Sequence, residues 1–338
     1  MILYDQRIPA SLIEFGIQIP VKDSRSIKTF KALLDDPKLL PLREHWHHDR
    51  IVETISREDL LRVHSANYVN RLYSDGLEQE IISTFELIDA EGKYYRYAPE
   101  TATRPLTDLF ERLLTKAAGS IQAARLALDH GFCFSFTGGA HHAQHDFGKG
   151  FCMMNDIVIA ARKLQHEKKV DRVWVIDVDA HKGDGTAALT AGDSSIRTLS
   201  VHMASGWPLD EPAVFADGNA NLSFIPSDID IPIESGEEGY YIERLQKGLN
   251  KLAENASADL AIVVCGADPY ENDELPSASR LKLSLEQMFA RDQLLYTWLM
   301  ERNIPSVFLM AGGYGEDVWR VYAQFLRWVL HLRHASHG

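Results

Sequence analysis

Residues 173–185, VWVIDVDAHKGDG, begin as an apolar run and end in three carboxylates and one histidine. The run has the length and β-branched content of a buried strand. Asp177, Asp179 and His181 are each two residues apart, so on an extended backbone their side chains leave the same face. Acidic groups placed so closely behind an apolar strand repel one another unless a cation joins them. The stretch therefore predicts a strand that ends in a metal site.

Similar apolar runs recur along the chain, and amphipathic segments separate them. Buried strands are expected at Cys133–Thr137, Arg172–Val178, Ile196–His202, Asp259–Cys265 and Pro305–Ala311. Helices are expected where apolar residues recur with helical periodicity: Ser26–Asp35, Arg57–Leu72, Leu106–His130, Asn155–Glu167, Glu238–Glu254, Ser284–Arg302 and Asp317–His331. Thr84–Pro105 is expected to be a long surface loop. This alternation predicts an α/β fold with an open, mainly parallel sheet flanked by helices on both faces, and we expect residues 1–338 to form a single domain.

Composition narrows the function classes. The 338 residues are 45% hydrophobic and 25% charged, which is typical of a globular protein with a large core. A formal net charge of −13 argues against a nucleic-acid partner. Three widely spaced cysteines (Cys133, Cys152 and Cys265) lie in apolar stretches and predict buried thiols rather than a disulfide framework. The first residues lack the layout of a secretion signal and no apolar run approaches the about 18 residues of a membrane span, so we expect a cytoplasmic protein without a membrane partner.

The polar motifs share one position relative to the predicted strands. Each directly follows a strand: His141 and His142, Asp179–Gly185, His202–Trp207, Asp268, and Gly312–Tyr314. In open α/β sheets, ligands bind at the carboxyl edge of the strands. Five separated segments are therefore expected to meet at one site.

The metal ligands are expected among these segments. A catalytic zinc commonly has three protein ligands and one open position. Asp179 and His181 supply two, and Asp268 is the best third ligand because it follows the strand Asp259–Cys265, with Asp273 as its competitor. Two carboxylates and one imidazole form a hard ligand set, so Fe2+ is an alternative to Zn2+.

The adjacent pair His141 and His142 supplies a general base and a proton donor. A histidine used in this way needs a carboxylate on its far nitrogen to fix its tautomer, and Asp177 and Asp184 are the spare carboxylates. Tyr314, on the glycine-rich turn MAGGYG, adds a phenol that can donate to a developing oxyanion. These residue types together indicate a metal-dependent amide hydrolase.

With these motifs assembled, the chain resembles the histone deacetylase family of the arginase and deacetylase superfamily, and its spelling is closest to class IV-like and bacterial members. The resemblance runs from about Arg57 to the C-terminus. It rests on GGAHHAQHDFGKGFCMMNDIVIAA, VIDVDAHKGDGT, CGADPYEND, LKLS and MAGGYG, in the family's order and at comparable spacing.

The resemblance assigns a role to each matching residue. It implies zinc ligands Asp179, His181 and Asp268, and a catalytic pair His141 and His142 with carboxylate partners Asp177 and Asp184. His142 is then the principal base and acid, His141 a mainly electrostatic partner and Tyr314 the carbonyl-polarising phenol. The backbone carbonyl of Gly150 faces the acyl-lysine amide, and Phe151 and Trp207 form the aromatic walls of the tunnel. A potassium ion is also implied, with ligands Asp177, Asp179, His181, Ser200 and Val201.

The sequence departs from the family's common spelling at several positions. Gly139 and Ala140 replace Pro-Gly before the histidine pair, and Lys182 replaces the second histidine of DxDxHHGDG. Trp207 replaces phenylalanine, Leu209 replaces the glycine after the following proline, and the stretch Glu274–Arg280 is longer than the common form. These changes leave acyl-chain preference open.

Three other functions compete with a lysine deacylase. An acetylpolyamine or other small-amide hydrolase would use the same mechanism. A ureohydrolase with two manganese ions would need a second aspartate where Gly183 stands. A non-catalytic acyl-lysine reader would not need the base, the proton donor and the ligands that the sequence contains.

Overall fold

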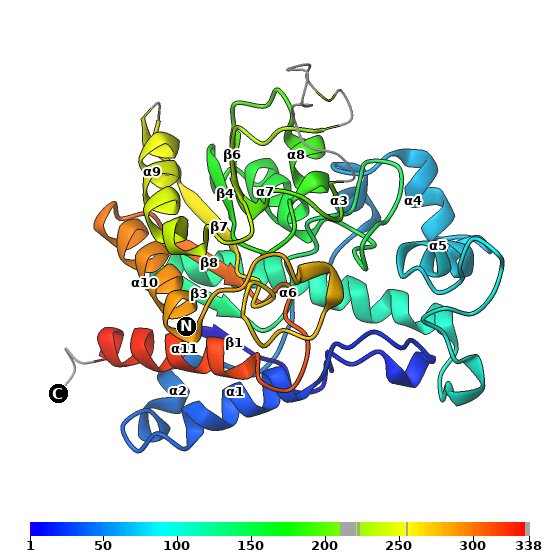
Figure 1. The fold of residues 1–338 in the computed structure, drawn as a ribbon, viewed down its shortest axis with the longest axis horizontal. Helices are drawn as coiled ribbons and strands as arrows, with labels where there is room; N and C mark the ends of the chain where they lie inside the picture. The colour runs from blue at the N-terminus through cyan, green and yellow to red at the C-terminus, as the bar shows by residue number, and fades with distance from the viewer. Residues whose placement is uncertain (210–220, 222–223, 255, 335–338) are drawn as a thin grey trace.

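An eight-stranded sheet forms the centre of the computed structural model, which describes residues 1–209, 221, 224–254 and 256–334 (Figure 1). All neighbouring strands run parallel, in the order β2-β1-β3-β8-β7-β4-β5-β6. The strands are β1 (Ile2–Leu3), β2 (His47–His48), β3 (Phe132–Ser135), β4 (Val173–Asp177), β5 (Ile196–Met203), β6 (Ile229–Ile233), β7 (Leu260–Val264) and β8 (Ser306–Leu309). The predicted parallel sheet is confirmed.

Helices connect the strands. The α-helices are α1 (Ser24–Leu34), α2 (Arg43–Trp46), α3 (Arg57–Leu61), α4 (Ala66–Leu72), α5 (Leu77–Thr84), α6 (Leu109–His130), α7 (Asp156–His166), α8 (Asp184–Thr190), α9 (Tyr241–Ala253), α10 (Leu285–Glu301) and α11 (Trp319–His334). Short 3₁₀ turns are η1 (Ile13–Phe15), η2 (Leu40–Leu42), η3 (Pro99–Thr101), η4 (Leu106–Asp108), η5 (Glu238–Tyr240) and η6 (Pro276–Ala278). Among the described residues, none of these helices combines the length and the apolar character needed to cross a bilayer.

Alternate strand residues enter two separate apolar layers, because successive side chains of a strand point to opposite faces. In β4, Trp174 and Ile176 pack into one layer, while Val173 and Val175 pack into the other. The first layer is covered by α1, α9, α10 and α11, and the second by helices that include α6 and α7. The sheet is thus flanked by helices on both faces, as the sequence predicts. The three free cysteines are buried, as expected.

One predicted helix is two helices in the structure. The stretch Arg57–Leu72 breaks between α3 and α4, because Ser65 caps the second helix through a bond from the Tyr68 backbone N–H. The loop prediction for Thr84–Pro105 holds apart from η3 and isolated bridges.

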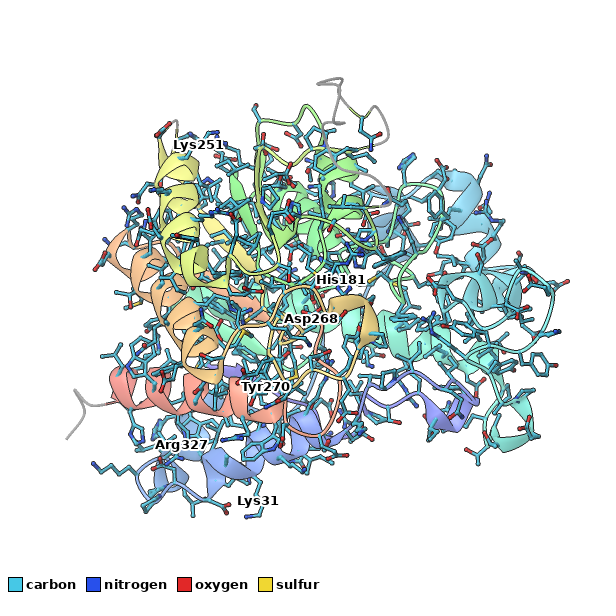
Figure 2. All side chains as sticks on the ribbon, viewed as in Figure 1. Lys31, His181, Lys251, Asp268, Tyr270 and Arg327 are labelled. Carbon is cyan, nitrogen blue, oxygen red and sulfur yellow. The ribbon has the colours of Figure 1, made fainter. Side chains whose placement is uncertain are left out.

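The polar motifs gather where the strands end. Asp177 is the last residue of β4, and Asp268 follows β7, its neighbour in the sheet. The last ladder bond runs from the Val178 N–H to the Val264 carbonyl, at 3.1 Å. His181 and Asp268 lie close together near the centre of the molecule (Figure 2). This edge of the sheet carries the candidate site.

Candidate active site

Asp179, His181 and Asp268 come together as a buried group. Each offers one ligand atom, and these atoms lie within 4.8 Å of one another. His181 Nδ1 lies 3.1 Å from Asp179 Oδ1 and 3.0 Å from Asp268 Oδ2. Burial alone would lower the pKa of His181, but the two carboxylates raise it to about 10, so the group attracts positive charge. The donor atoms and the local charge fit a divalent cation.

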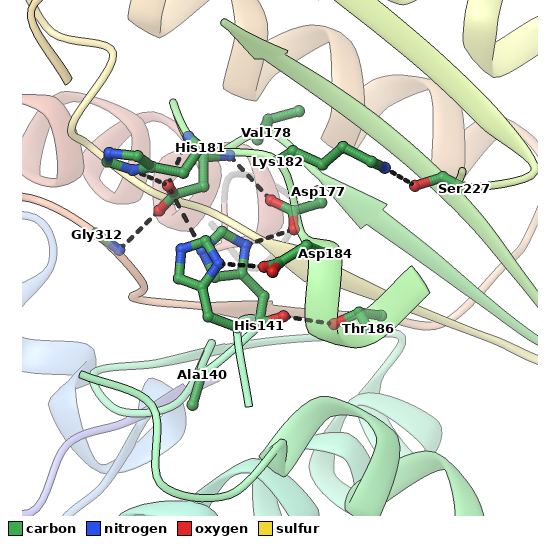
Figure 3. Close-up of polar contacts among 12 residues, drawn as sticks. Ala140, His141, Asp177, Val178, His181, Lys182, Asp184, Thr186, Ser227 and Gly312 are labelled. Carbon is green, nitrogen blue, oxygen red and sulfur yellow. Dashed lines mark hydrogen bonds and ion pairs between the residues drawn. The ribbon is translucent and has the colours of Figure 1, made fainter. Parts of the chain in front are cut away.

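Backbone groups and two glycines shape this group. The Ala180 N–H donates to Asp268 Oδ1 at 3.1 Å. The Gly312 N–H donates to Asp179 Oδ2, also at 3.1 Å (Figure 3). A Cβ atom at Gly266 would lie 2.3 Å from Asp179 Oδ2, and one at Gly312 would lie 2.5 Å from the same oxygen. Only glycine at both positions therefore leaves space for the carboxylates.

The histidine pair is held by the two expected carboxylates. His141 Nδ1 lies 2.6 Å from Asp177 Oδ2, and His142 Nδ1 lies 2.7 Å from Asp184 Oδ1. Asp184 also accepts bonds from Lys149 Nζ at 2.9 Å and from Gln144 Nε2 at 3.0 Å. Each bond holds its imidazole ring in a fixed orientation.

The two histidines of this pair differ in pKa. Burial would lower the pKa of His141, but the carboxylates of Asp177 and Asp179 raise it to about 9. Burial and the neighbouring His141 lower the pKa of His142 to about 3. His141 therefore binds a proton more tightly than His142 does, and such a difference is typical of paired groups with different tasks.

Tyr314 lines a cavity of about 190 Å³ that is also lined by His141, His142, Asp179 and His181. Burial raises the pKa of its phenol well above 10, and Asp268 and Asp179 raise it further, so the hydroxyl keeps its proton. Its backbone N–H donates to Asp273 Oδ2 at 2.7 Å. Asp273 therefore holds the tyrosine turn, and it lies outside the metal-ligand group formed by the described residues.

Gly150, Phe151 and Trp207 also line the cavity. The Trp207 ring lies 4.5 Å from the His142 ring and 5.5 Å from the His181 ring, measured between centroids. Gly150 has a φ of +56°, and a Cβ atom there would lie 2.2 Å from the Trp207 ring. The indole thus covers His142 and His181 and requires glycine beside it.

The residues of the implied potassium site lie next to the divalent group. Ser200 pairs in register with Asp177 across β4 and β5. Its hydroxyl oxygen is buried and has no hydrogen-bond partner among the described residues. A buried, unpaired hydroxyl oxygen beside carboxylates fits a ligand of a monovalent cation.

The Lys182 side chain does not contribute to the cavity that the histidine pair lines. Its buried ammonium donates to Asp230 at 2.6 Å. It also donates to Ser227 at 2.8 Å (Figure 3). Lys182, which replaces the family's second histidine, therefore holds its own loop to the segment around Ser227 and Asp230 and does not line the cavity.

Sequence reasoning missed several supporting residues. Ser277 Oγ lies 3.1 Å from His181 Nε2 and fixes the ring from its far side. Asp156 accepts bonds from the N–H groups of Gly139 and Ala140, directly before the histidine pair. The only signal for Asp156 is its place directly after the α7 cap residue Asn155.

Comparisons with known proteins agree with this geometry. A family model described as the histone deacetylase domain matches residues 19–329. An uncharacterized protein of Picosynechococcus sp. is 29% identical over 209 residues, which cover 62% of this chain and 64% of that protein. Histone deacetylase 2 of Arabidopsis thaliana is 29% identical over 279 residues, which cover 81% of this chain and 65% of that protein.

The acetoin utilization protein AcuC of Staphylococcus aureus is 28% identical over 185 residues, which cover 54% of this chain and 46% of that protein. The chain thus matches less than two thirds of the length of each of these relatives. The family model, in contrast, spans nearly all of the chain and includes every motif of the site. The chain belongs to the histone deacetylase family.

Proposed function

We propose that this chain is a metal-dependent hydrolase that removes acetyl or longer acyl groups from the amine of lysine side chains. One observation carries the proposal. His141, His142, Asp179, His181 and a protonated Tyr314 line a single cavity. Behind them, Asp177 and Asp184 hold the two histidines, and Asp268 completes the buried Asp-His-Asp group. Amide hydrolysis needs a base, a proton donor and oxyanion stabilisation, and these groups supply all three.

Asp179, His181 and Asp268 would hold Zn2+, with Fe2+ as the alternative ion. When bound, the cation polarises the amide carbonyl and acidifies water. A K+ ion is proposed beside it, and the buried, unpaired hydroxyl of Ser200 supports that proposal. Its ligands would be Asp177, Asp179, His181, Ser200 and Val201.

The protein's own residues account for the proton transfers. His142 is neutral, and because its Nδ1 is bonded to Asp184, its Nε2 takes a proton from the attacking water. The water oxygen bonds to the carbonyl carbon, and the Tyr314 hydroxyl donates to the carbonyl oxygen as it becomes negative. The C–N bond then breaks, and the proton held by His142 passes to the departing amine. Cationic His141 stabilises the negative charge throughout.

The cavity walls favour a lysine side chain over an acetylpolyamine. Phe151 and Trp207 offer flat apolar surfaces for a methylene stem. The Arg96 guanidinium lies 5.2 Å from the Phe151 ring and the Lys149 ammonium lies 5.4 Å from the Trp207 ring. Each of these cations is paired with one carboxylate, Glu86 or Asp184, so we expect the walls to lack the surplus negative charge that would hold the additional ammonium groups of a polyamine.

The size and lining of the cavity support acyl groups longer than acetyl. Part of the lining is apolar: Leu12, Ile19 and Val21 come from the N-terminal segment, Leu113 comes from α6, and Phe136 follows β3. Arg25 borders the same cavity and would attract the carboxylate product. Lys116 also borders it, but burial lowers the pKa of its ammonium to about 7.

The test is an activity profile of the metal-reconstituted protein over acetyl-lysine peptides, longer acyl-lysine peptides and acetylpolyamines. We expect hydrolysis of acyl-lysine peptides and its loss in a chelated control. A strong preference for acetylpolyamines would replace the lysine substrate by the small-amide alternative. Unchanged hydrolysis after complete removal of metal would refute metal dependence, and two manganese ions per chain would favour a ureohydrolase.

A further inference from the structure

Arg291 is a fully buried arginine on α10 that reaches the base of the metal-ligand group. Its Nη1 donates to the backbone carbonyl of Gly266 at 2.8 Å and to that of Val178 at 3.0 Å. Its Nε and Nη2 both lie 2.8 Å from Asp292 Oδ1. Burial of a guanidinium costs several kcal/mol unless its hydrogen bonds are satisfied, so this arrangement calls for an explanation.

The two carbonyls belong to the segments that carry the carboxylate ligands. Val178 directly precedes Asp179, and Gly266 lies two residues before Asp268. These segments leave the neighbouring strands β4 and β7, just after the last ladder bond between them. The guanidinium therefore bridges the two chains at the point where the strands stop pairing.

The remaining contacts balance the charge of Arg291. Asp292 is buried beside it, and Cys265 Sγ lies 3.6 Å from Arg291 Nη2 and 3.6 Å from Asp292 Oδ1. An arginine can serve three acceptors at fixed angles because its guanidinium is planar and has five donors. A lysine ammonium at this position could keep the charge but not the bridge.

We propose that Arg291 is a positioning residue that sets the spacing of the Asp179 and Asp268 carboxylates and thereby the affinity of the site for its divalent cation. The inference rests on the proposed metal site. It predicts that the helix layer behind the sheet, and not only the loops at its edge, determines how tightly the ion is held.

The experiment compares Arg291→Lys and the double variant Arg291→Met, Asp292→Leu with the wild-type protein. Removing both charges together avoids leaving a buried, unpaired carboxylate. The control is Leu295→Ala on the same helix, which removes buried apolar volume but no hydrogen bond to the ligand segments. The readouts are the dissociation constants for Zn2+ and Co2+ by chelator competition, the visible spectrum of the Co2+ form, and the melting temperature of the metal-free protein.

We expect both Arg291 variants to bind metal roughly 10- to 100-fold more weakly, as losses of groups that orient metal ligands commonly do, with an altered Co2+ spectrum. Leu295→Ala should lose thermal stability and keep the wild-type dissociation constants. Wild-type metal affinity in Arg291→Lys would overturn the bridging argument, since charge alone would then suffice. A wild-type protein that binds neither ion would overturn the proposed metal site itself, which separates the two failures.

Discussion

Replacing Asp184 by asparagine tests the proposed task of His142 most directly. The carboxylate lies 2.7 Å from His142 Nδ1, and its other oxygen is bonded to Lys149 and Gln144. Asparagine keeps the size and one hydrogen bond but removes the negative charge. Because His142 becomes cationic only after it has taken a proton, the lost attraction affects the transition state more than the resting protein.

The size of the effect follows from the geometry. Opposite charges about 4 Å apart attract by about 4 kcal/mol at an effective dielectric constant of about 20. The amide retains a neutral hydrogen bond of about 1 kcal/mol. The difference of about 3 kcal/mol corresponds to a roughly 100-fold lower kcat. An amide that turned its NH2 group toward Nδ1 would select the wrong tautomer and enlarge the loss.

The assay is steady-state hydrolysis of an acetyl-lysine peptide between pH 6 and 9, with kcat and KM determined separately and the metal content of each variant measured. Lys149→Met is the matched control, because it removes another partner of the same carboxylate and leaves the His142 contact intact. Its kcat should stay within about threefold of wild type, as expected for loss of a partly exposed ion pair. An Asp184→Asn protein with full metal content and a kcat within threefold of wild type would refute the reasoning.

Three further outcomes are expected. Tyr314→Phe should lower kcat more than tenfold without changing metal affinity, because only the oxyanion donor is lost, and unchanged turnover would remove Tyr314 from the mechanism. His64, which donates from Nδ1 to Gln144 and accepts at Nε2 from the Asn155 N–H, has its pKa lowered by burial from 6.5 to about 4. Between these two pH values the unfolded state therefore binds more protons than the folded state. This difference should lower the free energy of unfolding by roughly 2–3 kcal/mol between pH 7.5 and pH 4.5. Denaturant titration of His64→Gln should show a pH-dependent loss of stability that is smaller by this amount. Gly150→Ala should lower kcat/KM at least tenfold, because the added Cβ atom meets the Trp207 ring. The control is Gly131→Ala: Gly131 also has a positive φ, but no atom lies within 4 Å of an added Cβ, so this variant should lose stability and keep its activity. Equal activity of the two variants would contradict the clash.

The sequence predicts the fold well where one apolar run makes one strand. β4, β5 and β7 differ from their predicted ranges by one residue or less at each end, because each is buried on both faces and reads as a continuous apolar run. The edge strand β2 and its neighbour β1 have only two residues each, and β6 contains Pro232, so none of them shows such a run. These three elements gain their definition from pairing with a neighbouring strand rather than from local composition.

The site shows the same division. His141, His142, Asp179, His181 and Asp268 could be brought together from sequence because each follows a predicted strand, and parallel strands end at one edge. Arg291 could not be found in this way, because it lies inside a helix more than 100 residues from Val178, and its partners are backbone carbonyls without a side-chain signature. The roles of the site residues remain predictions for the experiments above.

The bridge made by Arg291 has a consequence for how this fold can diversify. Segments that emerge at the edge of a parallel sheet can change in length and composition with little effect on the apolar layers, so new specificities can evolve there. Val178 and Gly266 are exceptions, because the Arg291 guanidinium, which comes from helix α10, binds their backbone carbonyls. Insertions next to either residue should be much rarer among descendants of this chain than insertions a few residues farther along the same loops.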